Sequence, residues 1–588
     1  PKPDTQFMPV EDIRAGMTGY GITVFQGTKP ERFEVTVLGV LQGVPNPKQC
    51  SVIAKLSGAA VERTSVFAGM SGSPVYIDNK LVGAVAFTYP FSKEPIAGIT
   101  PIKFMIENFD RGPEHPAQAP QRVSFSTLIA DNGAKASAPD QATAGSSRTE
   151  PVSQMGSGGL VPIATPVSIS GVPQQAIDFF SSELKKFGIQ AIAGAGGASA
   201  LTPMVAATDD TLAPGTSVSV QLVRGDFTLD AAGTVTYREG NKIYAFGHPF
   251  LSSGVTSWPM AESPVITVVP NVNNSFKLDA GGSLVGSICQ DRSTGVYGEL
   301  GQKPKMIPVH VVVHTSRNKT ETYNFEMISD PALTPLLMKL MTFSAVTATE
   351  RSIGSQTISL NGRISIAGQP DLVLDNTFST ANGAVFQAVA AVEKPLAVLL
   401  GSGFDPIDIT GINVDVTSND ARASGTLSRL WVDKTEVHRG DTIEVQAFAR
   451  NDNGAEFVQR IPVKIPVDAP VGEVAVLVGD GNSINVADLR AQAGSDFTPK
   501  DLGQLVRRMN KLKHNNRLYV KVLRPGGGAV VNDEEMPTLP PSVLATLNSQ
   551  RTSGGYSPLL VATLTESELP PSVFVITGQQ SIMINIVK

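Results

Sequence analysis

The residues with the clearest chemical potential are those of Gly69-Met70-Ser71-Gly72-Ser73-Pro74, which the apolar run Val75-Tyr76-Ile77 follows. Glycines permit backbone angles that other residues avoid, so Ser71 can stand at the tip of a tight turn. In such a turn the N–H groups of Gly69 and Ser71 can point at one developing negative charge, as an oxyanion hole requires. The segment therefore indicates a nucleophile. The alternative is an ordinary Gly/Ser/Pro hairpin loop.

A serine nucleophile needs a base, and the chain has six histidines. His248 ends an apolar strand and precedes Pro249, which favours an extended backbone at the histidine. We take His248 as the candidate base. His310 and His314 fall on one face of a predicted strand, a context that favours structural roles.

A third group should accept the other imidazole N–H and hold the tautomer. Asp291, Asp279 and Glu262 follow His248 within the same predicted β unit. Asp291 is favoured, because it comes just after an apolar run and can lie at a neighbouring strand end. The alternative is a turn aspartate paired with Arg292.

The composition describes a β-rich protein of several domains. Of 588 residues, 41% are hydrophobic and only 17% are charged, with 55 Gly and 42 Pro, which fits many strands and turns. The net charge of −6 without a long basic run makes nucleic acid an unsuitable partner. No apolar run reaches the roughly 18 residues that span a membrane. Neither a metal-ligand cluster nor a cofactor motif is recognisable in the sequence.

Composition shifts divide the chain into seven segments. The predicted organisation is a serine-bearing β-barrel (1–110), a linker (111–160), a helical insertion (161–210), a histidine-bearing β-barrel (211–330), an α/β connecting region (331–424), an immunoglobulin-like β-sandwich (425–485) and a C-terminal α+β region (486–588). The first barrel is expected because about six short strands follow one another with little helix between them.

Apolar periodicity predicts several helices. They cover 102–109, 173–187, 331–343, a part of 384–400, and 499–513. Thr100 is the predicted N-cap of the first of them.

Two segments resemble the SpoIVB-type sporulation serine peptidases, a clan related to the chymotrypsin-like double barrel. They are the hexad 69–74 and Ile243-Tyr244-Ala245-Phe246-Gly247-His248-Pro249, and the stretches 16–25 and 92–101 also look like the family's bacterial relatives. The resemblance implies Ser71 as nucleophile, His248 as general base and the N–H groups of Gly69 and Ser71 as the oxyanion hole. The fold it implies is a chymotrypsin-like double β-barrel with accessory β-sandwich and α+β domains.

The chain departs from that family in three respects. Here the serine segment precedes the histidine segment, so the two barrels would be permuted, and they would dock within one chain or pair between chains. No PDZ-like module is recognisable. Met70 stands where trypsin-like enzymes carry an acidic residue, so activation by an ion pair with a new N-terminus is not expected.

The two cysteines, Cys50 and Cys289, lie one in each proposed barrel. They form a disulfide that joins the barrels, or they are two unrelated buried thiols. The low charged fraction favours an exported protein, and the start Pro-Lys-Pro-Asp reads as a mature terminus. We therefore expect a periplasmic or secreted protein.

These observations predict an exported serine endopeptidase of narrow specificity that cleaves a protein or peptide, with self-processing at the linker 128–156 as one form. The alternative is an inactive protease-like scaffold that acts as a binding or surface-structural protein, because a fold does not guarantee an activity.

Overall fold

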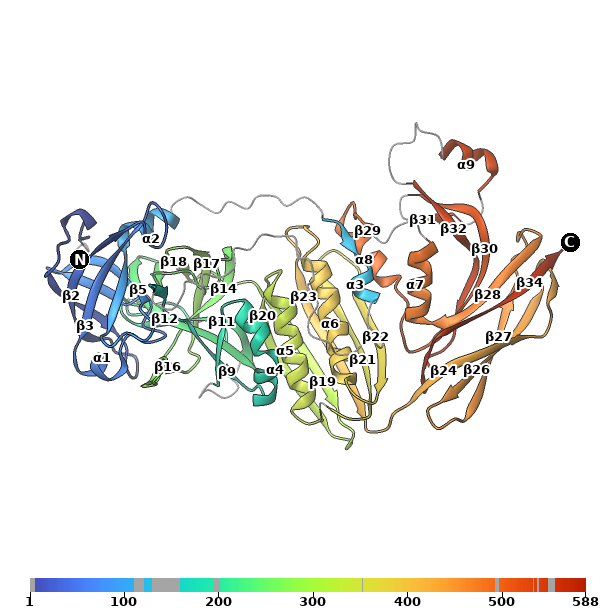
Figure 1. The fold of residues 1–588 in the computed structure, drawn as a ribbon, viewed down its shortest axis with the longest axis horizontal. Coiled ribbons are helices and arrows are strands. Elements are labelled where there is room, and N and C mark those ends of the chain that lie inside the picture. The colour runs from blue at the N-terminus through green and yellow to red at the C-terminus, as the bar shows by residue number, and fades with distance from the viewer. Residues whose placement is uncertain are drawn as a thin grey trace. The chain divides into compact units, whose positions relative to one another are not determined.

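The computed structural model describes residues 6–109, 121–129, 159–193, 201–351, 353–491, 496–531, 534–536, 539–547 and 556–588. Nearly all of the predicted linker and cleavage segment 128–156 lies outside these residues. The protein is mainly β (Figure 1). Chain contacts divide it into two compact units. The first comprises Pro1–Ala117, Ala142–His310 and Tyr323–Ser344, and the second comprises Gln118–Gln141, Val311–Thr322 and Ala345–Lys588.

The first unit begins with a closed six-stranded barrel, as predicted. Its strands pair in the order β4-β1-β2-β3-β6-β5, and β5 pairs back with β4. The strands are β1 (Thr18–Thr23), β2 (Glu31–Gln42), β3 (Cys50–Ser57), β4 (Pro74–Ile77), β5 (Lys80–Thr88) and β6 (Ile96–Pro101). The helices of this part are η1 (Val10–Asp12), α1 (Ala59–Thr64) and α2 (Ile102–Phe109). Alternation fills the barrel, since Phe33, Val35 and Val37 of β2 are buried while their neighbours face outward.

A second group of six strands in the same unit also pairs in a closed cycle, which we call the second ring. The order is β11-β12-β13-β18-β17-β14, and β14 pairs back with β11. The strands are β11 (Ser217–Gly225), β12 (Thr228–Glu239), β13 (Lys242–Ala245), β14 (Gly254–Glu262), β17 (Leu284–Arg292) and β18 (Gly295–Leu300). A buried cluster joins the barrel to this ring, because Leu81, Ala84 and Met105 pack with Tyr244 and Tyr297.

The other elements of the first unit extend these two groups. β8 (Val161–Pro162) pairs with β5, β9 (Pro166–Ser170) pairs with β12 and β10 (Gln190–Ala193), and β15 (Val265–Val269) forms a hairpin with β16 (Phe276–Asp279). Helix α4 (Gln174–Lys186) also belongs here. The segments β19 (Met306–His314), β20 (Thr320–Ile328) and α5 (Leu333–Thr347) cross the bounds between the units.

The second unit contains a small α/β layer and a β-sandwich. In the layer, helix α6 (Ala384–Leu400) packs on β21 (Gln356–Ile366) and β22 (Leu372–Thr380), and β21 also pairs with β23 (Ile409–Asn419). In the sandwich, one sheet is β27-β26-β24-β33 and the other contains β25, β34, β28, β30, β31 and β32. Their common core contains Val445 and Val476 together with Val520 and Ile584. Strands from the predicted segments 425–485 and 486–588 thus share one core.

The remaining bounds of the second unit are as follows. The strands are β7 (Val123–Ser124), β24 (Ser424–Val432), β25 (Glu436–His438), β26 (Thr442–Asn451), β27 (Glu456–Lys464), β28 (Gly472–Asp480), β29 (Asp496–Phe497), β30 (Leu518–Val531), β31 (Glu534–Met536), β32 (Tyr556–Glu568), β33 (Val575–Thr577) and β34 (Gln579–Val587). The helices are α3 (Ser126–Ile129), α7 (Gly481–Ala491), α8 (Leu502–Asn510) and α9 (Pro541–Leu547).

The helices predicted from periodicity are confirmed as α2, α4, α5, α6 and α8, with ends within a few residues of the expected ones. The predicted capping role of Thr100 is wrong. Thr100 lies in β6, and its hydroxyl donates to the carbonyl of Gly247 at 2.7 Å. The hydroxyl therefore joins the barrel to the histidine segment instead of starting a helix.

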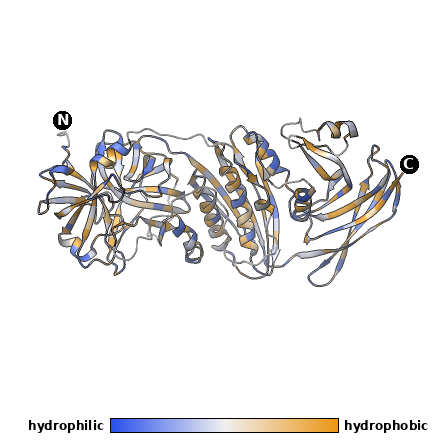
Figure 2. Cartoon of the chain, turned by 45° about the horizontal axis from the view of Figure 1, so that its top comes forward, coloured by the Kyte–Doolittle hydropathy of each residue, from blue (hydrophilic) through white to orange (hydrophobic). Residues whose placement is uncertain are grey.

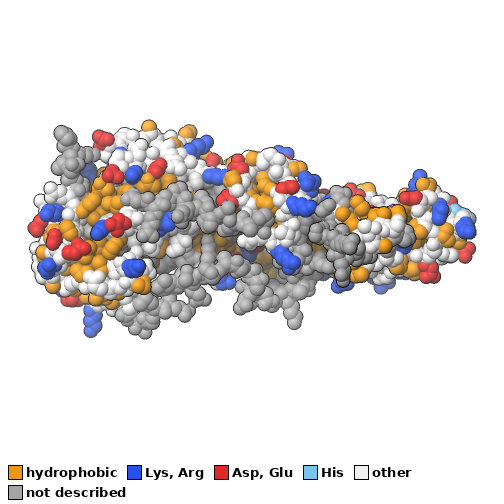
Figure 3. Space-filling view, turned by 90° about the horizontal axis from the view of Figure 1, so that it is seen from above, with side chains coloured by type: hydrophobic (Ala, Val, Ile, Leu, Met, Phe, Trp, Pro, Cys, Tyr) orange, Lys and Arg blue, Asp and Glu red, His pale blue; other side chains and the backbone are white. Residues whose placement is uncertain are grey.

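Hydrophobic positions recur along the strands and helices of the protein, interspersed with hydrophilic ones (Figure 2). On the face drawn in Figure 3, basic and acidic side chains are interspersed, and neither sign forms a continuous field. This mixture agrees with the modest net charge of −6.

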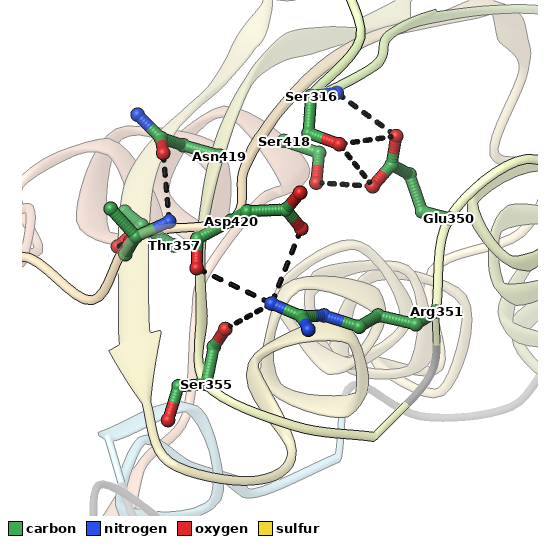
Figure 4. Close-up of polar contacts among 9 residues, drawn as sticks. Ser316, Glu350, Arg351, Ser355, Thr357, Ser418, Asn419 and Asp420 are labelled. Atoms are coloured by element: carbon green, nitrogen blue, oxygen red, sulfur yellow. Dashed lines mark hydrogen bonds and ion pairs between the residues drawn. The ribbon is translucent and has the colours of Figure 1, made fainter.

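A polar cluster in the second unit is fully paired. The buried carboxylate of Glu350 accepts from the N–H and hydroxyl of Ser316 and from the hydroxyl of Ser418, while Arg351 pairs with Asp420 (Figure 4). Because both oxygens of the Glu350 carboxylate accept hydrogen bonds, we interpret this cluster as structural.

Candidate active site

The turn that carries Ser71 lies between α1 and β4 of the first barrel. Met70 is fully buried in the core of the first barrel and anchors the turn there. Gly69 and Gly72 adopt φ values of 90° and 96°, which L side chains rarely adopt. Ser71 is fully buried, and its Oγ has no hydrogen-bond partner among the described residues.

The N–H groups of the turn fall into two sets. Those of Met70, Gly72 and Ser73 donate to the carbonyls of Phe67, Val85 and Met70. Among the described residues, no acceptor is found for the N–H groups of Gly69 and Ser71. These two are the donors that the sequence assigns to an oxyanion hole.

Strand β12 of the second ring holds the carbonyls of the same turn. The N–H of Thr234 donates to the carbonyl of Ser71 at 2.8 Å, and its hydroxyl donates to that of Gly69 at 3.0 Å. The hydroxyl of Thr236 donates to the carbonyl of Gly72 at 2.8 Å. With its carbonyls fixed on β12, the turn keeps the N–H groups of Gly69 and Ser71 free.

The histidine segment packs on β12 and β5, the two strands that also bind the serine turn. The N–H of Phe246 donates to the carbonyl of Thr234 at 3.3 Å, and Gly247 lies against the side chain of Ala84 on β5. Phe246 is a fully buried non-glycine residue with φ of 70°. Such a backbone is costly and is found most often at functional sites. Thr234 therefore contacts both the serine turn and the histidine segment.

The ring of His248 has one paired and one unpaired nitrogen. Nδ1 lies 2.8 Å from the carbonyl oxygen of Pro249, which can only accept, so Nδ1 carries the proton and donates. Nε2 is buried without a partner among the described residues. Burial lowers the pKa of His248 to about 4, against a smaller opposing effect of the Pro249 carbonyl. At neutral pH the ring is uncharged with Nε2 free to take a proton, as a general base requires.

The serine and histidine segments are thus brought into contact, although no hydrogen bond joins Ser71 to His248. A Cβ on Gly72 would lie 2.6 Å from the backbone nitrogen of Phe246, two residues before His248. Catalytic hydrogen bonds are often long or unformed before a substrate binds.

Asp291 lies at the end of β17, beside the turn that follows His248. Its carboxylate accepts from the N–H groups of Phe250, Leu251 and Ser253 at 2.8, 2.7 and 3.1 Å. Burial raises the pKa of Asp291 to about 6, and these backbone donors oppose the shift. The peptide between Pro249 and Phe250 therefore accepts from His248 through its carbonyl and donates to Asp291 through its N–H.

The other two acidic candidates lie elsewhere in the second ring and its hairpin. The buried carboxylate of Asp279 on β16 accepts from the hydroxyls of Ser168 and Ser263. Glu262 is half-buried at the end of β14. No hydrogen bond from His248 to either residue is found among the described residues.

Both cysteines are free thiols and no disulfide joins them; of the alternative of two buried thiols, Cys50 fits, whereas Cys289 is half-buried. Cys50 is buried on β3 of the barrel. The Sγ of Cys289 on β17 lies within hydrogen-bond distance of the carbonyl of Ser287 and the side chain of Gln302. Burial raises the pKa of both thiols.

Sequence reasoning missed three residues that contact the serine turn, namely Thr234, Thr236 and Lys277. Lys277 on β16 is fully buried, and its Nζ donates to the Thr234 hydroxyl at 3.0 Å. The alternation of Thr234 and Thr236 within an apolar strand was a signal for one polar face, but nothing local shows what that face contacts.

Within the described residues, no group of three or more His, Cys, Asp or Glu side chains is placed to hold a metal ion. The described helices include none that is both long and apolar enough to cross a membrane. Comparison of the chain with protein-family models, curated proteins and solved structures finds no match in any of the three.

Proposed function

We propose that this chain is a serine peptidase whose active site lies between the first barrel and the second ring. The observation that carries the proposal is a group of four unpaired polar atoms on two segments in contact. They are Oγ of Ser71, Nε2 of His248 and the nitrogens of Gly69 and Ser71. Leaving buried polar groups unpaired costs free energy, so their presence on two segments in contact favours a site that is completed by a substrate.

The chemistry follows from the position of the protons. His248 Nε2 takes the proton of the Ser71 hydroxyl as Oγ bonds to the substrate carbonyl carbon. The N–H groups of Gly69 and Ser71 donate to the oxygen that becomes negative. The protonated imidazole then gives its proton to the leaving amine as the C–N bond breaks, and water releases the acyl group by the same path.

Asp291 supports the base through one peptide group in this proposal. As His248 becomes positive, its Nδ1–H bond to the Pro249 carbonyl strengthens. Hydrogen-bonded chains polarise one another, so the Phe250 N–H then binds the Asp291 carboxylate more strongly. Asp291 is a positioning residue here, because it does not contact the imidazole in the structure.

We also propose that the barrel and the ring correspond to the two barrels of a chymotrypsin-like fold in reversed chain order, as the SpoIVB-type resemblance implies. The closed pairings of both strand groups support this assignment. The low charged fraction of 17% supports a periplasmic or secreted location, and the substrate would be a protein or peptide.

One observation favours the alternative of an inactive scaffold. Ser71 is fully buried, so a substrate carbonyl reaches it only when a neighbouring segment moves. An inactive scaffold would have no need of such a movement.

Labelling with a fluorophosphonate separates the two proposals. An active enzyme is labelled once, and Ser71→Ala abolishes the labelling of a folded protein. Ser73→Ala is the matched control, because its hydroxyl is also buried but is paired with the Met70 carbonyl at 2.6 Å. His248→Gln should slow labelling on the order of 10²–10⁴-fold. If the wild-type protein is not labelled, or if Ser71→Ala is labelled normally, the peptidase proposal fails and the scaffold remains.

A further inference from the structure

Lys277 is a fully buried lysine that contacts the serine turn and has no part in the chemistry above. Its side chain runs along Gly69, where an added Cβ would lie 3.1 Å from Cβ, Cγ and Cδ of the lysine. Burial lowers the pKa of Lys277 to about 7, against a smaller opposing effect of Asp279. A buried amine is expensive, so its retention calls for a role.

The ammonium group of Lys277 fixes the direction of a hydrogen-bonded chain. In this protonated form the group can only donate, so the Thr234 hydroxyl then accepts from it at 3.0 Å; the neutral amine, which a pKa of about 7 allows near neutral pH, can also accept. The single proton of that hydroxyl is then available for the Gly69 carbonyl at 3.0 Å. Without Lys277, the same proton could turn to the Thr23 hydroxyl, which lies 3.5 Å away.

Lys277 holds the peptide groups on both sides of Gly69. Its backbone N–H donates to the carbonyl of Ala68 at 2.9 Å, which orients the peptide that carries the Gly69 N–H. Its side chain, through Thr234, holds the following carbonyl. Because a peptide group is planar and trans, the held Ala68 carbonyl directs the Gly69 N–H to the opposite side, whereas the held Gly69 carbonyl belongs to the peptide of the Met70 N–H. Together the two contacts limit rotation of the backbone at Gly69.

We propose that Lys277 is a positioning residue for the Gly69 N–H. Its backbone N–H aims that donor at the oxyanion, and its side chain, through Thr234, keeps the backbone at Gly69 from rotating. The inference rests on the proposed peptidase function. It adds that one donor of the oxyanion hole is set by a residue of the second ring's β15–β16 hairpin, more than 200 residues away in the chain.

The test measures the second-order rate of fluorophosphonate labelling and the thermal midpoint in the full chain. Thr234→Val removes the relaying hydroxyl, Thr234→Ser keeps it, and Lys277→Met removes the ammonium. Thr236→Val is the matched control, since its hydroxyl holds the same turn at Gly72, beyond both oxyanion donors.

We expect Thr234→Val and Lys277→Met each to slow labelling by about tenfold, because a Gly69 backbone that is free to rotate misaligns its N–H, whereas complete loss of one oxyanion donor costs on the order of 10²–10³ in rate. Thr234→Ser should label at close to the wild-type rate. Thr236→Val should lower the thermal midpoint without slowing labelling. The double variant Thr234→Val/Lys277→Met should be no slower than the slower single variant, because both residues act in one chain.

Wild-type rates for Thr234→Val and Lys277→Met, or equal slowing by Thr236→Val, would overturn the inference while the peptidase proposal stands. If the wild-type protein is not labelled at all, the peptidase proposal fails separately. Amide hydrogen exchange of the segment 67–72 then tests whether Lys277 and Thr234 hold the backbone at Gly69. Exchange should accelerate in Thr234→Val and Lys277→Met relative to Thr236→Val, and equal exchange in all three would overturn the inference. Should Thr234→Val fail to fold, Lys277→Met against Thr236→Val gives the same comparison.

Discussion

The N–H of Thr234 donates a hydrogen bond of 2.8 Å to the carbonyl of Ser71, and this contact joins the second ring to the serine turn of the first barrel. The carbonyl of the same threonine accepts from Phe246, two residues before His248. One residue of β12 therefore contacts both the turn of the proposed nucleophile and the segment of its base.

Gly72→Ala should separate the turn from β12. A Cβ at this position would lie 1.9 Å from the Thr234 carbonyl, and φ of 96° is unfavourable for alanine. We expect a loss of several kcal/mol in the free energy of unfolding, above the roughly 1–2 kcal/mol that the backbone angle alone costs. Gly16→Ala is the control, since Gly16 has φ of 87° with nothing within 4 Å. Chemical denaturation measures both, and equal losses would contradict the close approach.

The rate of labelling should depend on pH with an inflection near 4. His248 acts as a base only when its ring is neutral, and burial lowers its pKa to about 4. The rate should therefore fall as the pH drops through 4, below a smaller change near 6 where the Asp291 carboxylate takes up its proton. In Asp291→Asn only the inflection near 4 should remain, and one near 6.5, the ordinary value for histidine, in that variant would contradict the buried and uncharged ring.

Asp291→Asn should change how stability depends on pH. The folded pKa of about 6 lies above the unfolded value of about 3.9, so the folded state binds the extra proton between these values. The contribution of Asp291 to stability therefore decreases as the pH rises from 4 to 6, by roughly 3 kcal/mol in total. The contribution of His248 to stability changes in the opposite direction. Its pKa is lowered on folding, so this contribution increases as the pH rises from 4 to 6.5.

In wild-type protein these two contributions largely offset each other. In Asp291→Asn the contribution of His248 is no longer offset by that of Asp291, and stability should rise with pH more steeply than in wild type. The variant should also lose about 1–3 kcal/mol at neutral pH, since an amide NH₂ cannot accept from the backbone donors. Denaturation at pH 4, 5, 6 and 7 measures the slopes. Asp178→Asn, on the exposed face of α4, should keep the wild-type slope.

Local patterns predicted the elements of this fold well. The helix Gln174–Lys186 was predicted because Ile177, Phe180 and Leu184 recur on one face, and all three are buried. The closed first barrel followed from short alternating strands with turns between them. Glycines around Ser71 and the His248-Pro249 pair marked the two segments that the structure brings into contact.

Long-range partners could not be predicted in the same way. The contact of Gly69 with Lys277 joins residues about 200 positions apart, and no local pattern encodes it. β16 was not predicted as a strand, because its four residues are too few for their alternation to be distinctive. Thr100 was expected to cap a helix, but the hydroxyl donates to Gly247 instead, since tertiary contact outweighs the local preference.

The free state of the two cysteines gives the last prediction. Cys50 and Cys289 lie on strands β3 and β17 and are both unpaired, with their pKa values raised by burial. A thiol reagent should therefore react slowly with the folded protein, because the thiolate is the reactive form. After unfolding without reductant it should titrate two thiols per chain. Cys50→Ser and Cys289→Ser should each reduce that number to one, and reductant should leave the thermal midpoint unchanged. Titration of no thiols in the unfolded wild-type chain would instead show that the two cysteines are bonded to each other.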